Sequence, residues 1–199
     1  MLSNVSGWLV DYYYRHGRTA AALDLAERAS STGAQAGLDT QAHLYELMGK
    51  WREAEGMYTS ASAGYENPAA LLGFYYRAVN VRKQALFEPE WKSTLERVFP
   101  SGLQPAPTGD AHPAVGVVVT QDSELSRKAG LQTDDIITGL EGWRAENLHQ
   151  YYAINAFFET KDMKLTVWRG RTFTVEVTAP NRLMGISLRT YPIRGWSER

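Results

Sequence analysis

A repeat of 32 residues runs through the first part of the chain and constrains its fold more than any other feature. Gly17 and Gly49 are separated by this interval, and each follows a tyrosine-containing stretch and precedes an alanine-rich one. The other residue pairs at the same offset are Tyr13 and Tyr45, Ala22 and Ala54, Ala26 and Tyr58, and Ala29 and Ala61. A chain with such a repeat is predicted to fold as a row of similar units.

Each unit is predicted to be a pair of helices joined at its glycine. Glycine adopts the positive φ of a helix C-terminus at low energetic cost. Small residues near the middle of the second helix allow two helices to approach closely, and aromatic residues at the end of the first helix fill the space between pairs. One such hairpin cannot bury its apolar face alone, so the pairs are expected to stack.

A third, less regular helix pair is expected to end the stack. Asn67 and Pro68 form a strong helix start, with asparagine as the N-cap and proline at the first helical position. Pro89 opens a further short helix. Three pairs are about the minimum for a stable stack, so a helical domain is predicted over residues 1–100.

The pattern resembles the tetratricopeptide repeat, a helix–turn–helix unit of about 34 residues. The interval is two residues shorter here, and Ser6 stands where the family has a large residue. The resemblance implies a concave face that holds a protein partner. The matching residues are Leu9, Tyr13, Gly17, Ala22 and Ala29 in the first unit, and Tyr45, Gly49, Trp51, Ala54, Tyr58 and Ala61 in the second.

The segment from Pro100 to Pro113 separates the helical half from the rest of the chain. It contains four of the eight prolines. Proline fixes φ and lacks an N–H donor, so this segment is expected to be neither helix nor central strand. We therefore predict a semi-rigid, proline-rich linker over residues 101–113 and a second domain over residues 114–193.

The second domain is predicted to be a small α+β module. Ser123 is expected to cap a short helix that Gly130 closes. Residues 146–159 are predicted to form a longer helix rich in aromatic residues. The apolar and alternating stretches predict strands at residues 115–119, 136–140, 163–169, 173–178 and 184–188.

This order of elements resembles a PDZ domain of the bacterial type. Ala129-Gly130-Leu131 followed by Asp134-Asp135-Ile136-Ile137 matches the A-G-L-x-x-G-D-x-I core of that family, with Asp134 where glycine is usual. Residues 165–170 resemble its L-x-V-x-R-x-G hairpin, with the glycine one position early. Leu183-Met184-Gly185-Ile186 lies at the end, as in circularly permuted members whose ligand-side strand comes last. The resemblance implies a partly open β-barrel that binds an extended peptide or a chain terminus by strand addition.

The resemblance also implies which residues contact the peptide. By the resemblance, the position of His149 at a helix start suits a hydrogen bond to a ligand side chain, although a solvated surface histidine is the commoner outcome for such a residue. Gly185 is expected to shape the binding loop, with a simple bend before the last strand as the alternative. Tyr151, Ile154 and Phe158 suit the core. The predicted binding residues are Leu183, Met184, Gly185, Ile186 and Ser187 on the loop and last strand, and His149, Tyr152, Ala153 and Ala156 on the helix.

Catalysis, metal binding and cofactor binding find no support in the sequence. The chain has no cysteine, and its four histidines have no metal-binding spacing. No nucleophile elbow or phosphate-binding loop occurs. The net charge of −1 gives no case for nucleic acid. No apolar run is long enough for a membrane span, and residues 1–10 lack the features of a signal peptide, which leaves the compartment open.

The favoured interpretation is a non-catalytic adaptor of two modules. The repeats hold one protein, and the groove of the second domain holds a peptide, with a homo-oligomer as a further possibility. One alternative is a regulatory, substrate-recognition piece of a larger bacterial protease. Another is a structural module with a closed groove.

Overall fold

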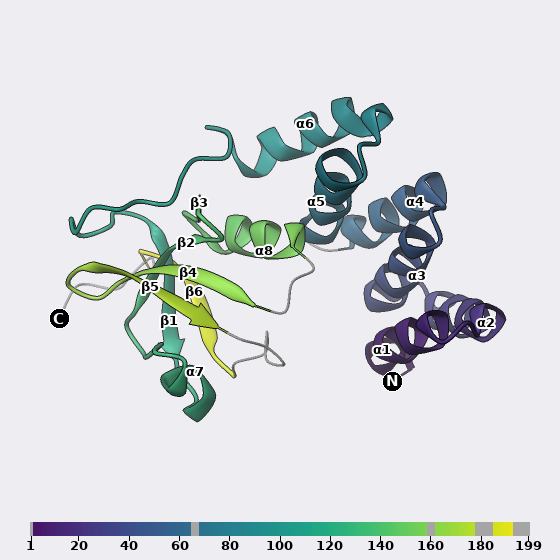
Figure 1. Ribbon diagram of the computed structural model, residues 1–199, viewed down its shortest axis with the longest axis horizontal. Helices are drawn as coiled ribbons and strands as arrows, with labels where there is room; N and C mark the ends of the chain where they lie inside the picture. The colour runs from purple at the N-terminus through teal and green to yellow at the C-terminus, as the bar shows by residue number, and fades with distance from the viewer. Residues whose placement is uncertain (1, 65–67, 159–161, 178–184, 193–199) are drawn as a thin grey trace. The chain divides into compact units, whose positions relative to one another are not determined.

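The computed structural model of the chain describes residues 2–64, 68–158, 162–177 and 185–192 (Figure 1). Helices make up the N-terminal half, and an open antiparallel sheet makes up the C-terminal half, which confirms the two-part α plus β layout. The chain divides into two compact units, Met1–Trp91 and Lys92–Arg199. The division falls inside α6 (Glu88–Val98), whereas the sequence placed the boundary at residue 100.

The N-terminal unit consists of successive helices that pack against their neighbours. A π-helical turn, Arg77–Val81, extends the fifth helix, and a short 3-10 turn, Ala85–Phe87, precedes α6. Asn67 lies outside the described residues, and Pro68 immediately precedes the fifth helix. The helices are α1 (Leu2–Arg15), α2 (Thr19–Ser30), α3 (Gln35–Leu47), α4 (Trp51–Ala63) and α5 (Ala69–Tyr76).

The first two helix pairs turn in the same way, as the 32-residue interval predicted. Gly17 and Gly49 have φ values of 73° and 72°. At the first turn, Arg18 places its guanidinium 4.4 Å from the centre of the Tyr13 ring. The equivalent Lys50 has its ammonium nitrogen 5.4 Å from the centre of the Tyr45 ring. Both turns therefore combine a left-handed glycine with a cation against the preceding tyrosine.

The first two hairpins pack through small residues. Ala22, Ala26 and Ala29 of α2 are buried. A side chain on Gly37 of α3 would overlap the carbonyl group of Ala29, so α3 lies directly against α2. Leu44 of α3 is fully buried and belongs to the apolar cluster formed with α1 and α2. The apolar face of the second hairpin is thus covered by the first hairpin.

A buried ion pair joins α3 to the start of the π-helical turn. The Arg77 guanidinium donates from Nε and from a terminal nitrogen to the two carboxylate oxygens of Glu46, both at 2.7 Å. The Tyr58 hydroxyl donates to the same carboxylate at 3.0 Å. Glu46 is only 6% exposed. Its charge therefore depends on Arg77 for compensation.

Asp39 on α3 carries a buried oxygen without a hydrogen-bond partner among the described residues. Burial raises the pKa of Asp39 to about 6. Because this value lies above that of an unfolded aspartate, about 3.9, the folded state binds the proton more tightly. Protonation of Asp39 therefore stabilises the folded state, and this stabilisation is complete below about pH 4. That contribution is lost as the pH rises through about 6.

Asp39→Asn is therefore expected to be more stable than the wild type at neutral pH. The expected gain is about 1–2 kcal/mol, an amount reduced to allow for the partial exposure of the side chain. The difference should disappear below about pH 4, where the wild-type carboxyl group is neutral in both the folded and the unfolded state. Thermal unfolding at both pH values measures it, with Asp24→Asn as the exposed control. A gain of the same size at both pH values would show that the raised pKa of Asp39 is not the cause of the gain.

The C-terminal unit is built on one antiparallel sheet with the strand order β5-β4-β2-β1-β6, in which β3 also pairs with β2. Two helices, α7 (Glu124–Lys128) and α8 (Leu148–Phe157), follow β1 and β3. The order of elements is the one predicted, with β3 as an addition. The strands are β1 (Gly116–Gln121), β2 (Ile136–Leu140), β3 (Trp143–Arg144), β4 (Met163–Trp168), β5 (Thr172–Val177) and β6 (Ser187–Tyr191).

Asp135 joins the start of β2 to the β4–β5 turn. Its side chain is fully buried, and it accepts hydrogen bonds from Nε and a terminal nitrogen of Arg169, both at 2.6 Å. The backbone N–H of Gln132 also donates to it at 2.9 Å. Asp134 has a φ of 70°, which explains why glycine would suit this position. The predicted cap is also confirmed, because the Ser123 hydroxyl accepts from the N–H of Ser126 at 3.1 Å.

Residues 101–113, which we call the strap, lie along the C-terminal unit (Figure 1). The Gln104 carbonyl accepts from the N–H of Arg144 at 2.7 Å. The Asp110 side chain accepts from the N–H of Thr172 at 2.8 Å, and its carbonyl accepts from the Trp168 indole at 3.1 Å. The segment predicted as a linker is therefore hydrogen-bonded to the C-terminal unit.

Candidate functional site

The edge of β6 is the main candidate for a binding surface. β6 pairs with β1 on one side and is the last strand in the sheet order. Among the described strands, none pairs with its other edge. The N-terminus of α8 lies close to this strand, because the N–H of Leu148 donates to the Thr190 hydroxyl at 3.2 Å. The two elements predicted to border a groove are therefore neighbours.

The predicted helix residues differ in their exposure. His149 is exposed, Tyr152 is 44% exposed, and Ala156 is half-buried. Ala153 is fully buried, so its side chain belongs to the core and cannot contact a ligand in this conformation. The helix begins at Leu148 rather than at residue 146, since the side chain of the N-cap residue accepts from the backbone N–H of the third helical residue.

The strand side of the site begins at a glycine in a left-handed conformation. Gly185 has a φ of 61°, and a Cβ there would lie 3.3 Å from the Cβ of Ser123. Ile186 is half-buried and Ser187 is exposed. β6 starts at Ser187, three positions after the predicted start, because the bend at Gly185 comes first. Leu183 and Met184 lie outside the described residues.

Thr190 is a residue of this site that sequence analysis missed. Its hydroxyl reaches the first turn of α8, but it lies beyond the predicted end of the last strand. The sequence signal that could have extended the strand is the alternation of apolar Ile186 and Leu188 with polar Ser187 and Arg189, but it ends before the polar Thr190.

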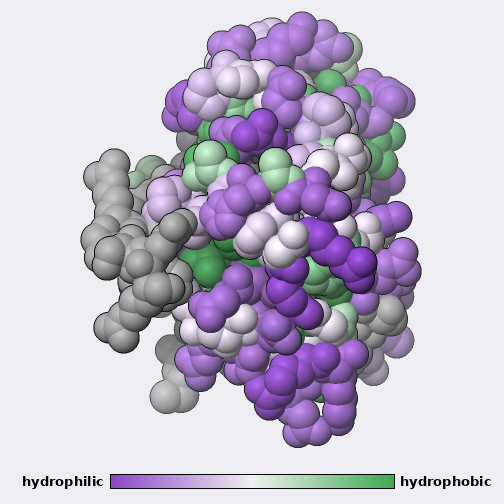
Figure 2. Space-filling view, turned by 90° about the vertical axis from the view of Figure 1, so that its left-hand side faces the viewer, coloured by the Kyte–Doolittle hydropathy of each residue, from purple (hydrophilic) through white to green (hydrophobic). Residues whose placement is uncertain are grey.

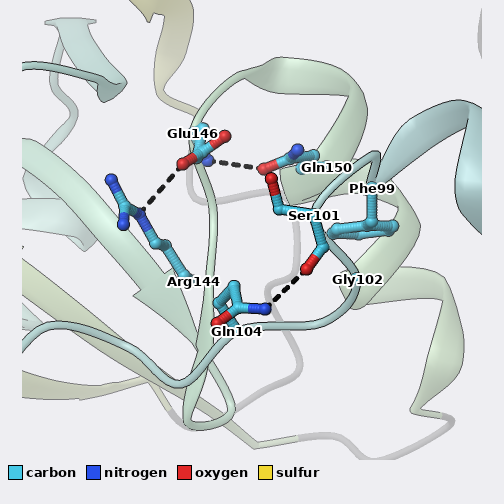
Figure 3. Close-up of a pocket in the computed structure, with 7 residues that line it drawn as sticks. All are labelled: Phe99, Ser101, Gly102, Gln104, Arg144, Glu146 and Gln150. Atoms are coloured by element: carbon cyan, nitrogen blue, oxygen red, sulfur yellow. Dashed lines mark hydrogen bonds and ion pairs between the residues drawn. The ribbon is translucent and has the colours of Figure 1, made fainter.

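A small pocket elsewhere in the C-terminal unit lies beside the strap (Figure 3). Its volume of about 10 Å³ is that of roughly one water molecule. The Gln150 side chain accepts from the N–H of Glu146 at 2.8 Å, and the Gln104 amide donates to the Ser101 carbonyl at 2.6 Å. Its polar groups thus bind one another, and the space is too small for an organic substrate. The lining residues are Phe99, Ser101, Gly102, Gln104, Arg144, Glu146 and Gln150.

The surface shown in Figure 2 is mainly hydrophilic, with apolar residues in small separate patches. Within the described residues, no group of three or more histidine, aspartate and glutamate side chains is placed to hold a metal ion. None of the described helices has the length and apolar character needed to cross a membrane.

No family model and no curated protein matches the chain.

Proposed function

We propose that this protein is a non-catalytic adaptor that binds an extended peptide or a chain terminus. The peptide adds a strand to the edge of β6 and lies against α8, as in the PDZ-like arrangement that the sequence resembles. The N-terminal unit, with its tetratricopeptide-like hairpins, holds a second protein. The observation that carries the proposal is the position of β6 at the end of the sheet with α8 beside it.

The order of elements supports the PDZ-like part of the proposal. A hairpin followed by a glycine bend and an edge strand agrees with the permuted arrangement. His149 and Tyr152 are exposed on α8, so both can contact a ligand. An exposed strand edge offers main-chain donors and acceptors, and neighbouring side chains select the sequence.

A closed groove is the second candidate, and one observation favours it. The hydrogen bond from Leu148 to Thr190 joins α8 and β6 directly at one end of the site. If this contact persists, a peptide can enter only from the Gly185 end. Thr190→Val removes the acceptor oxygen, so stronger peptide binding by that variant would identify the contact as a barrier.

The proposal is tested at Gly185. Gly185→Val places a β-branched side chain at positive φ and against Ser123, which costs about 1–2 kcal/mol in the left-handed region. We expect a peptide selected from a display library to lose at least about tenfold in affinity, which is about 1.4 kcal/mol. Calorimetric titration measures the binding, and thermal melting measures the folding.

Thr174→Ala is the matched control for this test. Thr174 is exposed on β5, at the opposite end of the sheet from β6. Affinity and melting temperature should stay at wild-type values in this variant. Equal affinities for the wild type and Gly185→Val would show that β6 is not the docking edge.

A further inference from the structure

The two faces of the sheet in the C-terminal unit meet different elements. On one face, the Thr190 hydroxyl of β6 accepts a hydrogen bond from the first turn of α8. Successive residues of a strand point to opposite faces, so Tyr191 lies on the other face. Gly116 pairs with Tyr191, and a Cβ at Gly116 would lie 2.8 Å from Cγ2 of Ile136. The Ile136 side chain therefore lies over Gly116, on the same face as Tyr191.

The apolar residues of this second face are buried, although α8 meets β6 on the first. Val118 is 1% exposed and Ile136 is 4% exposed. Val118 pairs with Ile136, which also pairs with Trp168, so the three side chains form one row across β1, β2 and β4. The Trp168 indole donates to the Asp110 carbonyl of the strap at 3.1 Å. The strap is therefore the segment that meets this row.

His112 of the strap connects two strands that are not neighbours in the sheet. Its ring centre lies 4.4 Å from that of Trp168 on β4, with the ring planes at 73°, and 5.9 Å from that of Tyr191 on β6. In the strand order, β2 and β1 separate β4 from β6. The three rings thus form a bridge across the second face, and its β4 end is fixed by the hydrogen bond from Trp168 to the strap.

We infer that the strap is a clamp that holds the C-terminal end of β6 on the sheet, and that His112 is the positioning residue through which it acts. The consequence for binding rests on the proposed function, in which β6 is the docking edge. β6 has five residues and pairs with β1 alone among the described strands. Such short edge elements open at a low cost in free energy. Because a peptide can pair only with a strand that is in place, the fraction of molecules with β6 detached lowers the apparent affinity.

Amide hydrogen exchange of the full chain, followed by NMR, tests the clamp without any ligand. In His112→Ala, the β6 amide protons should exchange at least about fivefold faster, because two ring contacts are lost. Amide protons of β2, in the middle of the sheet, should keep their wild-type rates. His112→Phe retains a ring at this position and should restore the protection of β6. Thr108→Ala changes an exposed residue of the same strap and is the matched control, with wild-type rates expected throughout.

Unchanged β6 exchange in His112→Ala, or equal acceleration by Thr108→Ala, overturns the clamp. An increase in exchange spread evenly over the whole sheet also overturns it, because it would indicate a general loss of stability. Failure of His112→Phe to restore protection counts against the ring contacts as its cause.

Peptide titration separates a failure of this inference from a failure of the proposed function. A peptide selected against the wild type should bind His112→Ala at least about threefold more weakly and His112→Phe with wild-type affinity. If Gly185→Val weakens binding and His112→Ala does not, the positioning role of His112 is wrong and the docking edge stands. If neither variant weakens binding, the docking edge is wrong, and the exchange rates alone decide the clamp.

Discussion

Arg169→Met is expected to destabilise the C-terminal unit by about 3–5 kcal/mol. The variant removes the only cation that binds the fully buried carboxylate of Asp135 within the part of the chain that the structure describes. One backbone N–H, from Gln132, still donates to that carboxylate, but it does not compensate a buried charge. The shift in the midpoint of guanidinium unfolding measures the loss.

The partner variant should cost less. Arg169 is 39% exposed, so its guanidinium can turn to water when Asp135 is replaced. We therefore expect Asp135→Ala to cost about 2 kcal/mol, mainly through the N–H of Gln132 that loses its acceptor. Arg171→Met, two residues along the same turn and exposed, is the control and should change stability by less than about 0.5 kcal/mol. Equal losses for Arg169→Met and Arg171→Met would contradict this account.

Arg77→Met should have a comparable effect on the N-terminal unit, also about 3–5 kcal/mol. It leaves the carboxylate of Glu46, 6% exposed, with the Tyr58 hydroxyl as its remaining described donor. Replacing both partners, as in Glu46→Leu with Arg77→Met, should recover much of the loss, because no buried charge remains. Chemical unfolding followed by helical circular dichroism measures both variants.

Arg28→Ala provides the control for the N-terminal unit. Arg28 pairs with Asp24 on the surface of α2, and both side chains are more than 60% exposed. Such pairs contribute about 0–1 kcal/mol. If Arg28→Ala costs as much as Arg77→Met, burial is not what makes the Glu46 pair important.

The helical hairpins could be predicted from the sequence because their turns depend on local chemistry. Gly17 and Gly49 need a positive φ, and a glycine at a fixed interval is visible in the sequence. The third turn could not be found this way. There Lys83, with a φ of 59°, takes the left-handed conformation after a π-helical turn, and neither feature has a clear sequence signature.

Only part of the candidate site could be predicted. The sequence did not show which side of α8 faces the core, and it did not show contacts between residues far apart in the chain. Residues 151–158 include four aromatic residues, so the apolar pattern did not fix which side of α8 faces the core. Phe158 was expected in the core but is only half-buried, and Phe157 is buried in its place. Ala153 was expected on the ligand side but is buried in the core. The strap was missed because its contacts use backbone groups and Asp110, which a proline-rich composition does not reveal.

The length of β6 limits how a bound peptide would be held. Five residues of strand span roughly 17 Å. Since neighbouring residues point their main-chain groups to opposite edges, only two or three of them face an added strand. Each hydrogen bond contributes about 1 kcal/mol net, whereas association costs at least about 4 kcal/mol in lost freedom of motion. Main-chain pairing over so short a footprint barely offsets that cost, so lifetime and selectivity would come from the few side chains that flank the strand. Under the proposed function, such a complex would form and dissociate quickly, which would suit an adaptor that exchanges its ligands.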